Sequence, residues 1–264
     1  MSQNGGHPDC YIPIVCPICQ TMEHPAFKIN SEIDRVQLAD EFHNSGRVQI
    51  HNALAVETAN ALAAMLEQQT DWGIAWQAGS QGPHYHDAAA TMAQGAAGLN
   101  AIQSATYNAL SGKDYGFQFG SYPMLKAYLE HWKPSSIHDY VFEHINDFGF
   151  MDLVRHVTGM PDLKKADAQA TLYAPNHFLA QHDDSHVGQG WRVAYVLNLC
   201  PIEWRPDWGG YLNFFNKEGD IITGWRPRFN TLNLFRIPQL HHVSFVPPFA
   251  PAARFAITGW FRDR

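Results

Sequence analysis

Positive charge and long apolar runs are both scarce in this chain. Its 264 residues include 18 Lys and Arg against 25 Asp and Glu, a formal net charge of −7 at pH 7. Binding of nucleic acid through its phosphates needs clustered positive charge, so nucleic acid is not expected as a partner. No run approaches the roughly 18 consecutive apolar residues of a membrane span, and the N-terminus lacks a secretory pattern. We therefore expect no membrane partner and a cytoplasmic location.

Cysteine is also sparse, with four residues in the whole chain. Cys10, Cys16 and Cys19 lie close together near the N-terminus, and C-P-I-C has the C-x-x-C form of zinc and redox sites. A zinc site needs four placed ligands and no second C-x-x-C follows, so metal binding by these cysteines is left open. Cys200 is solitary and is expected to be a small buried hydrophobic residue. Because no disulfide framework is evident, a reducing compartment fits.

The N-terminal segment carries Gly, Pro and Cys without the periodicity of a helix or a strand. We therefore expect residues 1–21 to be a disordered tail, and both Met1 and Met22 remain candidates for the start of translation. Residues 22–264 are expected to form one domain, since a hydrophobic content of 45% suffices for a folded core.

Apolar residues at a spacing of three to four predict helices in the first part of this domain. The predicted helices cover residues 32–42, 55–69, 89–111 (with breaks at Gly95 and Gly98) and, less regularly, 134–158. A short alternating segment at 47–51 predicts a strand. We expect residues 22–160 to act as a helical support for a catalytic core at about 165–264.

The last part of the chain has the composition of β structure. Segments rich in β-branched and aromatic residues predict strands at 173–184, 191–199, 211–215, 231–235 and 254–261. Pro and Gly residues at 201–210 indicate a loop. Several short strands at near-regular spacing favour a closed or double-sheet β structure over alternating βα units. The predicted fold class is mainly β with flanking α.

Histidine is abundant, with 15 residues, and one pattern carries most of the chemical information. His182 and Asp184 form an H-x-D pair, and His241 and Arg254 follow at a distance. Alternation along a strand puts residues 182 and 184 on one face, where both can reach one metal. Two imidazoles and a carboxylate hold one face of an octahedral metal and leave the opposite face open. Arg254 adds a planar, permanently charged fork for a carboxylate. The pattern predicts a non-heme iron(II) site with an acidic co-substrate.

Each candidate also has a structural alternative. Arg254 at a strand start could form a surface ion pair worth little. However, residues 254, 256 and 258 share a face, so Arg254 and Thr258 would both point into the barrel and hold the co-substrate, Arg254 as a charge clamp and Thr258 as a hydroxyl donor. A buried arginine there needs an anionic partner. Asp183 is either a solvated turn carboxylate or an acceptor for a ligand imidazole. The tryptophans are expected to be core or loop anchors: Trp191, Trp204, Trp208, Trp225 and Trp260.

Several motifs follow one another over about residues 165–264: His182 and Asp184, Leu197-Asn198, Trp204, Gly209-Gly210, Leu234-Phe235, His241, and RFAITGW at 254–260. Their order resembles the catalytic domain of the 2-oxoglutarate- and iron(II)-dependent dioxygenases, in particular the prolyl-4-hydroxylase-like branch. The resemblance implies a double-stranded β-helix (jelly-roll) core, with iron(II) held by His182, Asp184 and His241. It also implies that 2-oxoglutarate binds the iron and Arg254, and that hydroxylation is coupled to its decarboxylation.

The same resemblance bears on individual residues. It places the second histidine ligand at the first position of L-H-H-V, which favours His241 over His242. Family members often carry a tyrosine near position 173 that hydrogen-bonds the co-substrate, so Tyr173 is a candidate, with a core aromatic residue as an equal alternative. Halogenating relatives replace the carboxylate ligand by a small residue, so the presence of Asp184 favours hydroxylation.

The expected function is therefore an iron(II)- and 2-oxoglutarate-dependent dioxygenase that uses O2 to hydroxylate a C–H bond, releasing succinate and CO2. A prolyl or other peptidyl residue is the favoured substrate, and ascorbate is a candidate reductant. Two alternatives stay open. One is a hydroxylase of a free amino acid or metabolite, whose carboxylate would pair with Arg192, Arg205, Arg226 or Arg228. The other is a non-catalytic metal-binding jelly roll of the cupin kind. The substrate, the hydroxylated position and the oligomeric state are left open.

Overall fold

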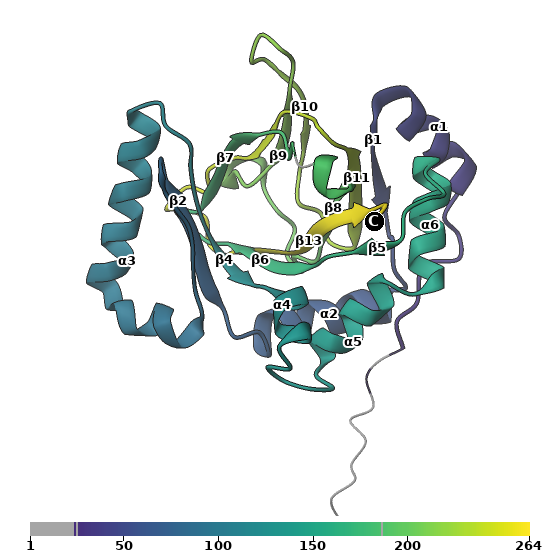
Figure 1. Cartoon of the computed structure of the whole chain (residues 1–264), viewed down its shortest axis with the longest axis horizontal. Helices are drawn as coiled ribbons and strands as arrows, with labels where there is room; N and C mark the ends of the chain where they lie inside the picture. The colour runs from purple at the N-terminus through teal and green to yellow at the C-terminus, as the bar shows by residue number, and fades with distance from the viewer. Residues whose placement is uncertain (1–23, 25, 186) are drawn as a thin grey trace, which may run out of the picture.

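Thirteen antiparallel strands form one sheet that curls into a jelly roll (Figure 1). The structure is a computed structural model, and it describes residues 24, 26–185 and 187–264. Hydrogen-bonded neighbours follow the order β1-β11-β8-β13-β6-β4-β7-β12-β9-β10, while β2 pairs with β3 and β4, and β5 pairs with β13. Apart from the consecutive pairs β2–β3 and β9–β10, neighbours in the sheet are not consecutive along the chain. The predicted jelly roll with flanking helices is confirmed.

The strands have the following bounds: β1 (Arg47–His51), β2 (Gly73–Ala78), β3 (Gln81–His86), β4 (Gly116–Tyr122), β5 (Lys165–Ala166), β6 (Gln169–Tyr173), β7 (Phe178–His182), β8 (Trp191–Asn198), β9 (Leu212–Phe215), β10 (Ile221–Trp225), β11 (Thr231–Arg236), β12 (His241–Val243) and β13 (Arg254–Arg262). Short 3₁₀ turns, η1 (Val187–Gln189) and η2 (Pro206–Trp208), lie in the loops.

Strand β13 separates the helix-covered core from the interior of the barrel. Ile257 and Phe261 belong to the core beneath the helices, whereas Ala256 packs with the cluster inside the barrel. Because side chains alternate along a strand, Arg254, Thr258 and Trp260 share the inner side with Ala256. The inner side of β13 thus carries most of the polar candidates.

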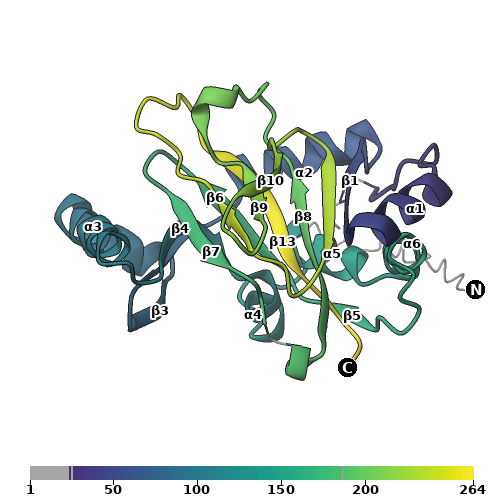
Figure 2. The ribbon, with the colours of Figure 1, turned by 90° about the horizontal axis from the view of Figure 1, so that it is seen from above.

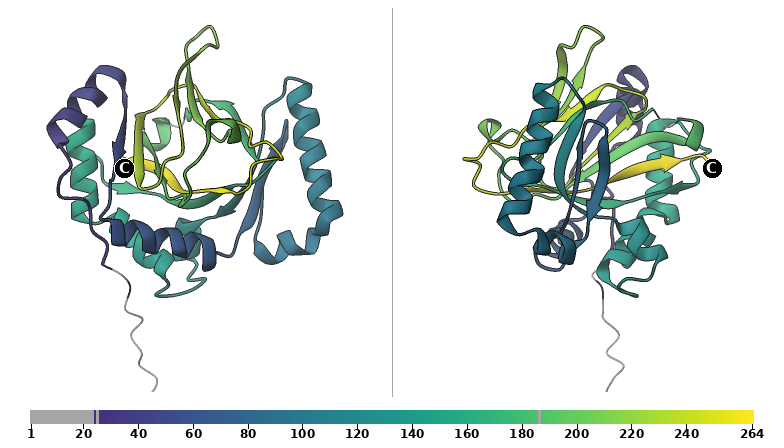
Figure 3. Two further views of the ribbon diagram at one scale, coloured as in Figure 1. Left: turned by 180° about the vertical axis from the view of Figure 1, so that it is seen from behind. Right: turned by 60° about the vertical axis from the view of Figure 1, so that its left-hand side comes forward.

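Five helices cover the outer face of the sheet: α1 (Arg35–Ser45), α2 (Val56–Gln68), α4 (Met124–Leu129), α5 (Ile137–Ile145) and α6 (Phe148–Thr158). In Figure 1, α2, α4 and α5 lie below the sheet, and α1 and α6 lie side by side at the right. Helix α3 (Ala88–Ser111) packs against β2 on the opposite flank, apart from the other helices in Figures 2 and 3. None of the described helices is both long and apolar enough to cross a bilayer.

Local chemistry explains where the helix boundaries differ from the prediction. Helix α1 starts later than expected because the Asp34 carboxylate accepts hydrogen bonds from the backbone N–H groups of Val36 and Gln37. The single helix predicted at 134–158 is wrong. It is divided into α5 and α6, because Asp147 caps α6 and the Asn146 side chain leaves the helix to bond the backbone of β5. Helix α3 continues through a kink at Gly95.

The prediction for residues 173–184 as one strand is also wrong. The chain turns at 174–177, where Asn176 has a left-handed backbone with φ 73°, so Tyr173 ends β6 and His182 ends β7. The strand predictions missed β2, β3, β4, β5, β10, β12 and all of β6 except Tyr173. Because β2, β3 and β4 lie before residue 160, the N-terminal part contributes strands to the sheet as well as helices. The expectations for residues 1–21, for Cys10, Cys16 and Cys19, and for the two start methionines lie outside the described residues.

Candidate metal and co-substrate site

Three potential metal ligands meet where β7 and β12 pair. His182 and His241 are direct partners in the antiparallel register, and their ring centroids are 4.1 Å apart. The Asp184 carboxylate lies against both imidazoles, with Oδ1 3.4 Å from His182 Nε2 and Oδ2 3.6 Å from His241 Nε2. Ligand atoms about 2.1 Å from one metal and at right angles would be about 3 Å apart. The cluster is therefore close to the geometry that one ion needs.

Asp184 reaches this position through a turn. The expectation that His182 and Asp184 share one face of a single strand is therefore wrong, although both residues do reach the same site. Strand β7 ends at His182, and Asp184 has a left-handed backbone with φ 57°. The Asp183 carboxylate accepts a hydrogen bond from the backbone N–H of Ser185, as expected of a turn carboxylate. The turn brings the second carboxylate back over the two imidazoles.

Both imidazoles have their tautomers set by backbone carbonyl groups. His182 Nδ1 donates to the carbonyl of Ala180 at 2.9 Å, and His241 Nδ1 donates to the carbonyl of Gln239 at 2.7 Å. A carbonyl oxygen only accepts, so the hydrogen of each neutral ring lies on Nδ1 and the lone pair on Nε2. Both lone pairs lie on the side of Asp184. Metal-binding histidines typically donate their other ring N–H to a backbone carbonyl in this way.

Charge in the cluster is set by burial and by the neighbours. Burial, helped by the charge of His182, lowers the pKa of His241 to about 4, so this ring is neutral at neutral pH. Burial alone would lower the pKa of His182, but the hydrogen bond and charge of Asp184 raise it. Burial would raise the pKa of Asp184, yet His182, His241 and the Trp260 indole together lower it, so Asp184 is ionised. An ionised carboxylate suits a metal ligand.

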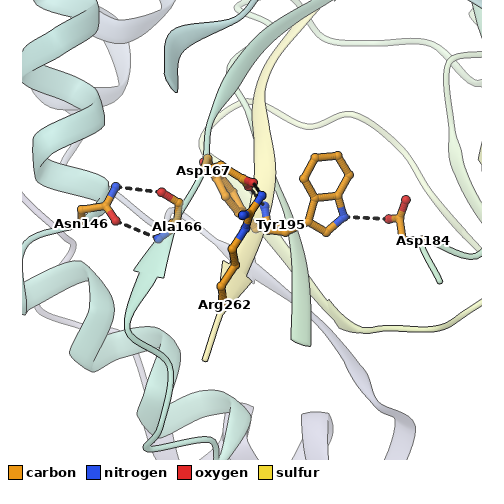
Figure 4. Close-up of polar contacts among 7 residues, drawn as sticks. Asn146, Ala166, Asp167, Asp184, Tyr195 and Arg262 are labelled. Carbon is orange, nitrogen blue, oxygen red and sulfur yellow. Dashed lines mark hydrogen bonds and ion pairs between the residues drawn. The ribbon is translucent and has the colours of Figure 1, made fainter. Parts of the chain in front are cut away.

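The Asp184 carboxylate is held from the other side by the indole of Trp260. Trp260 Nε1 donates to Asp184 Oδ2 at 2.9 Å (Figure 4). Asp167 fixes the backbone of Trp260, because its Oδ1 accepts from Trp260 N at 2.7 Å and its own N–H donates to Trp260 O. The other Asp167 oxygen pairs with Arg262, and the Trp260 ring stacks on Trp191. The orientation of a potential metal ligand thus depends on a strand-edge network.

Arg254 lies deeper in the barrel, on the same side of β13. It is 2% exposed, and its Nη1 donates to the carbonyl of Gly210 at 2.6 Å. Nη2 is 3.4 Å from Asn198 Oδ1, and the guanidinium carbon lies 5.0 Å from the centre of the Tyr173 ring. Nε is buried with no hydrogen-bond partner among the described residues. A buried guanidinium with an unused donor and no described carboxylate beside it has the chemistry of an anion site.

The residues present fit the iron(II) and 2-oxoglutarate that the resemblance implies. The cluster offers two imidazole nitrogens with free lone pairs and one ionised carboxylate. The unused N–H of Arg254 is a donor that a carboxylate would satisfy. No described residue contradicts either group.

Comparison with known proteins was made by sequence and by structure. Residues 168–262 match the model of the 2OG-Fe(II) oxygenase superfamily. The chain carries a 2OG-Fe(II) oxygenase domain. A search of the curated proteins finds no sequence that matches this chain. The oxygenase match begins just before β6 and ends with β13, so it includes the three candidate ligands and Arg254.

Solved structures with the same fold extend over most of the chain. A prolyl-4-hydroxylase from Pseudomonas putida is 18% identical with a TM-score of 0.55, over 86% of this chain and 98% of that one. A 2OG-Fe(II) oxygenase family protein from Burkholderia pseudomallei is 10% identical with a TM-score of 0.57, over 90% and 94%. The alpha-ketoglutarate-dependent epimerase SnoN of nogalamycin biosynthesis is 10% identical with a TM-score of 0.51, over 87% and 82%. The fold of this oxygenase is thus shared by proteins described as different enzymes.

The remaining sequence candidates fall into different places. His242 lies beside Asn213, whose Nδ2 is 2.9 Å from the His242 ring nitrogen, and its ring meets Phe215 edge-on. The alternative ligand is therefore engaged elsewhere. Tyr173 stacks on Phe119, as expected of a core aromatic residue, and its ring also faces Arg254. Cys200 is fully buried, as predicted.

Two residues near the ligands were not predicted from sequence. Trp260 was expected to be a core or loop anchor, whereas it hydrogen-bonds Asp184. Tyr115 lies edge-on to the His182 ring, and burial together with the charge of Asp184 raises its pKa to about 12. The only sequence signal for Trp260 was its place on the inner side of the Arg254 strand.

Proposed function

We propose that this oxygenase uses iron(II), 2-oxoglutarate and O2 to hydroxylate a carbon atom of a prolyl or other peptidyl residue. One observation carries the proposal. A His–Asp–His cluster with both Nε2 lone pairs available lies in the same barrel as a buried arginine whose described contacts include no carboxylate. The superfamily match over residues 168–262 supports the same chemistry.

In this proposal His182 and His241 bind iron through Nε2, and Asp184 binds it through a carboxylate oxygen. Three protein ligands would leave further coordination positions for 2-oxoglutarate and O2. Iron and 2-oxoglutarate supply the oxidising chemistry when bound, and 2-oxoglutarate leaves as succinate and CO2. The protein fixes the ligand geometry: the Ala180 and Gln239 carbonyl groups hold the two rings.

Arg254 is proposed to bind the distal carboxylate of 2-oxoglutarate, beside the ring of Tyr173. Thr258 lies four residues along the same strand, which puts its Cα about 13 Å from that of Arg254 at about 3.3 Å per residue. Thr258 lies on the same inner side of β13, nearer to Trp260 than Arg254 does, and we propose its hydroxyl as a donor to the co-substrate.

A peptidyl substrate is favoured over a free amino acid because three of the four arginines considered for a substrate carboxylate are engaged. Arg192 pairs with Asp263, and Arg226 donates to the Trp204 carbonyl. Arg205 pairs with Asp207 on the exposed η2 turn. An internal residue of a polypeptide has no free carboxylate and needs none of them.

The test is product analysis after anaerobic loading with iron(II). The protein is mixed with 2-oxoglutarate, ascorbate and O2, and is offered either prolyl peptides or free amino acids. We expect mass spectrometry to find one added oxygen atom on a peptide and one succinate for each hydroxyl group formed. His241→Ala should abolish this product, and the adjacent His242→Ala should retain it.

Three results would count against the proposal. Tight coupling to a free amino acid, with every peptide inert, would favour the small-molecule hydroxylase. Retained turnover in His241→Ala but not in His242→Ala would move the ligand by one residue. Iron binding without any 2-oxoglutarate consumption would favour a non-catalytic metal-binding protein.

A further inference from the structure

A surface groove of about 440 Å³ runs between α4 and the Thr258–Trp260 part of β13. Leu125 and Leu129 of α4 form one wall, and Thr258 and Trp260 of β13 form the other. Ligand-binding pockets in proteins commonly have volumes of about 300–1,000 Å³. The groove is thus large enough for a ligand group, and it lies outside the pocket of Arg254.

One residue, Trp260, links the groove to the metal cluster. Trp260 lines the groove and also donates its indole N–H to Asp184 at 2.9 Å. The Trp260 ring is fixed, because it stacks on Trp191 with centroids 4.1 Å apart and its backbone is held by Asp167. A group that occupies the groove against Trp260 is therefore one side chain away from the proposed iron ligand.

The chemistry of the groove favours an apolar occupant. Leu125, Leu129 and Trp260 present mainly hydrocarbon surface. Lys126 and Glu130 at the rim lie 4.0 Å apart, and both also engage Trp132, whose indole N–H donates to Glu130. These two charges offset each other, and Asp167, which also lines the groove, is paired with Arg262, so the groove offers no unpaired charge to an ionic ligand.

The groove also opens to solvent, because the Leu129 side chain is 66% exposed. An open groove allows the main chain of a polypeptide to enter and leave. A binding site for a free amino acid would instead enclose most of the ligand. A substrate that placed its target carbon at the metal cluster and a second group against Leu129 must extend past Trp260. A polypeptide segment meets this requirement.

We propose that the groove between α4 and β13 binds an apolar side chain next to the hydroxylated residue of a polypeptide substrate. This inference rests on the proposed peptidyl hydroxylation and adds a sequence preference to it. Burial of a leucine side chain is favourable enough to change kcat/KM by about tenfold or more. The wall formed by Leu129 should set this preference.

The test uses short peptides blocked at both ends, each with one prolyl residue and with Leu, Ser, Glu or Lys immediately before or after it. The wild-type protein should prefer Leu over Glu and Lys at one of the two positions by about tenfold or more in kcat/KM. Leu129→Glu should lower kcat/KM for the Leu peptide through KM. It should raise kcat/KM for the Lys peptide, because a carboxylate then faces the added amine.

Val36→Glu is the matched control, since Val36 is 67% exposed on α1, away from the groove. It should leave the peptide preference unchanged. The gain on the Lys peptide shows that Leu129→Glu is folded and active, which a general loss of activity would not. Hydroxylation of all peptides at equal rates, or the same profile in Leu129→Glu and Val36→Glu, would refute the groove assignment alone. Absence of hydroxylation on every peptide would overturn the proposed function, and the groove assignment with it.

Discussion

Replacement of Trp260 by phenylalanine tests whether the indole N–H controls the metal ligand. Phenylalanine keeps an aromatic ring against Trp191 and removes only the donor that lies 2.9 Å from Asp184 Oδ2. A hydrogen bond to a charged acceptor contributes about 1.5–3 kcal/mol. Trp260→Phe loses part of this stabilisation in the metal-free protein as well as in the metal-bound protein, because Asp184 is ionised in both. The change in metal affinity should therefore be smaller than the whole bond.

Outer partners of metal ligands typically change metal affinity by about 10–100-fold, which corresponds to about 1.4–2.8 kcal/mol. We expect Trp260→Phe to weaken metal binding by about tenfold, near the lower limit of this range. The direct measurement is anaerobic titration with iron(II), or with manganese(II) as a redox-stable substitute, followed by calorimetry. 2-Oxoglutarate should bind the metal-saturated variant nearly as well as the wild type, because Arg254 is untouched.

Trp72→Phe is the control for the loss of an indole hydrogen bond as such. Trp72 Nε1 donates to the carbonyl of Leu66 at 3.1 Å, and its ring stacks on Phe255 on the helix-covered side of the sheet. Trp72→Phe should lower the melting temperature without any change in metal affinity. The reasoning would be refuted if Trp260→Phe bound metal as tightly as the wild type, or if both variants weakened metal binding equally.

Three further predictions concern other parts of the molecule. Arg254→Lys keeps a charge but loses the planar fork, so the 2-oxoglutarate requirement should rise by about ten- to a hundredfold in a steady-state assay, with iron content unchanged. His138 is 3% exposed, and burial with the charge of Lys133 lowers its pKa from 6.5 to about 4. Between about pH 6.5 and pH 4 the His138 imidazole is protonated in the unfolded chain but neutral in the folded protein. The contribution of His138 to the free energy of unfolding of the apo-protein should therefore be constant above about pH 6.5 and fall by up to about 3 kcal/mol towards pH 4. His138→Gln should reduce this loss, as measured by urea unfolding. Gly209 has φ 58°, and an added Cβ would lie 1.9 Å from the Phe245 carbonyl oxygen, so Gly209→Ala should destabilise the fold by at least about 2 kcal/mol in the same assay.

The identity of the ligands could be predicted because it depends on side-chain chemistry and order. An H-x-D pair, a distant histidine and an arginine have few uses in common other than a metal with an anionic co-substrate. The structure brings His182, Asp184 and His241 together and buries Arg254. The local path was harder to predict: Asp184 follows a left-handed turn, and such turns leave only a weak signal when the residue is not glycine.

The partners of these residues could not be predicted, since they come from distant segments. The indole of Trp260 meets a carboxylate 76 positions earlier in the chain, and nothing in RFAITGW distinguishes such an indole from a core anchor. The hairpin of β2 and β3 was missed for a related reason. Its second strand, QGPHYH, contains glycine, proline and two histidines, and it becomes a strand because β2 offers it an edge for pairing.

Strand β13 shows how packing far from the metal secures the geometry of the site. Its outer residues Ile257 and Phe261 are fully buried beneath the helices, while Arg254 and Trp260 occupy the inner side at opposite ends. Because side chains alternate, a slip of one residue would move the arginine to the helix-covered core and turn the phenylalanine inward. Burying an unpaired guanidinium among apolar side chains is costly enough to exclude this register. The apolar core beneath the helices therefore determines which residues reach the metal cluster, although Ile257 and Phe261 lie on the opposite face of the strand.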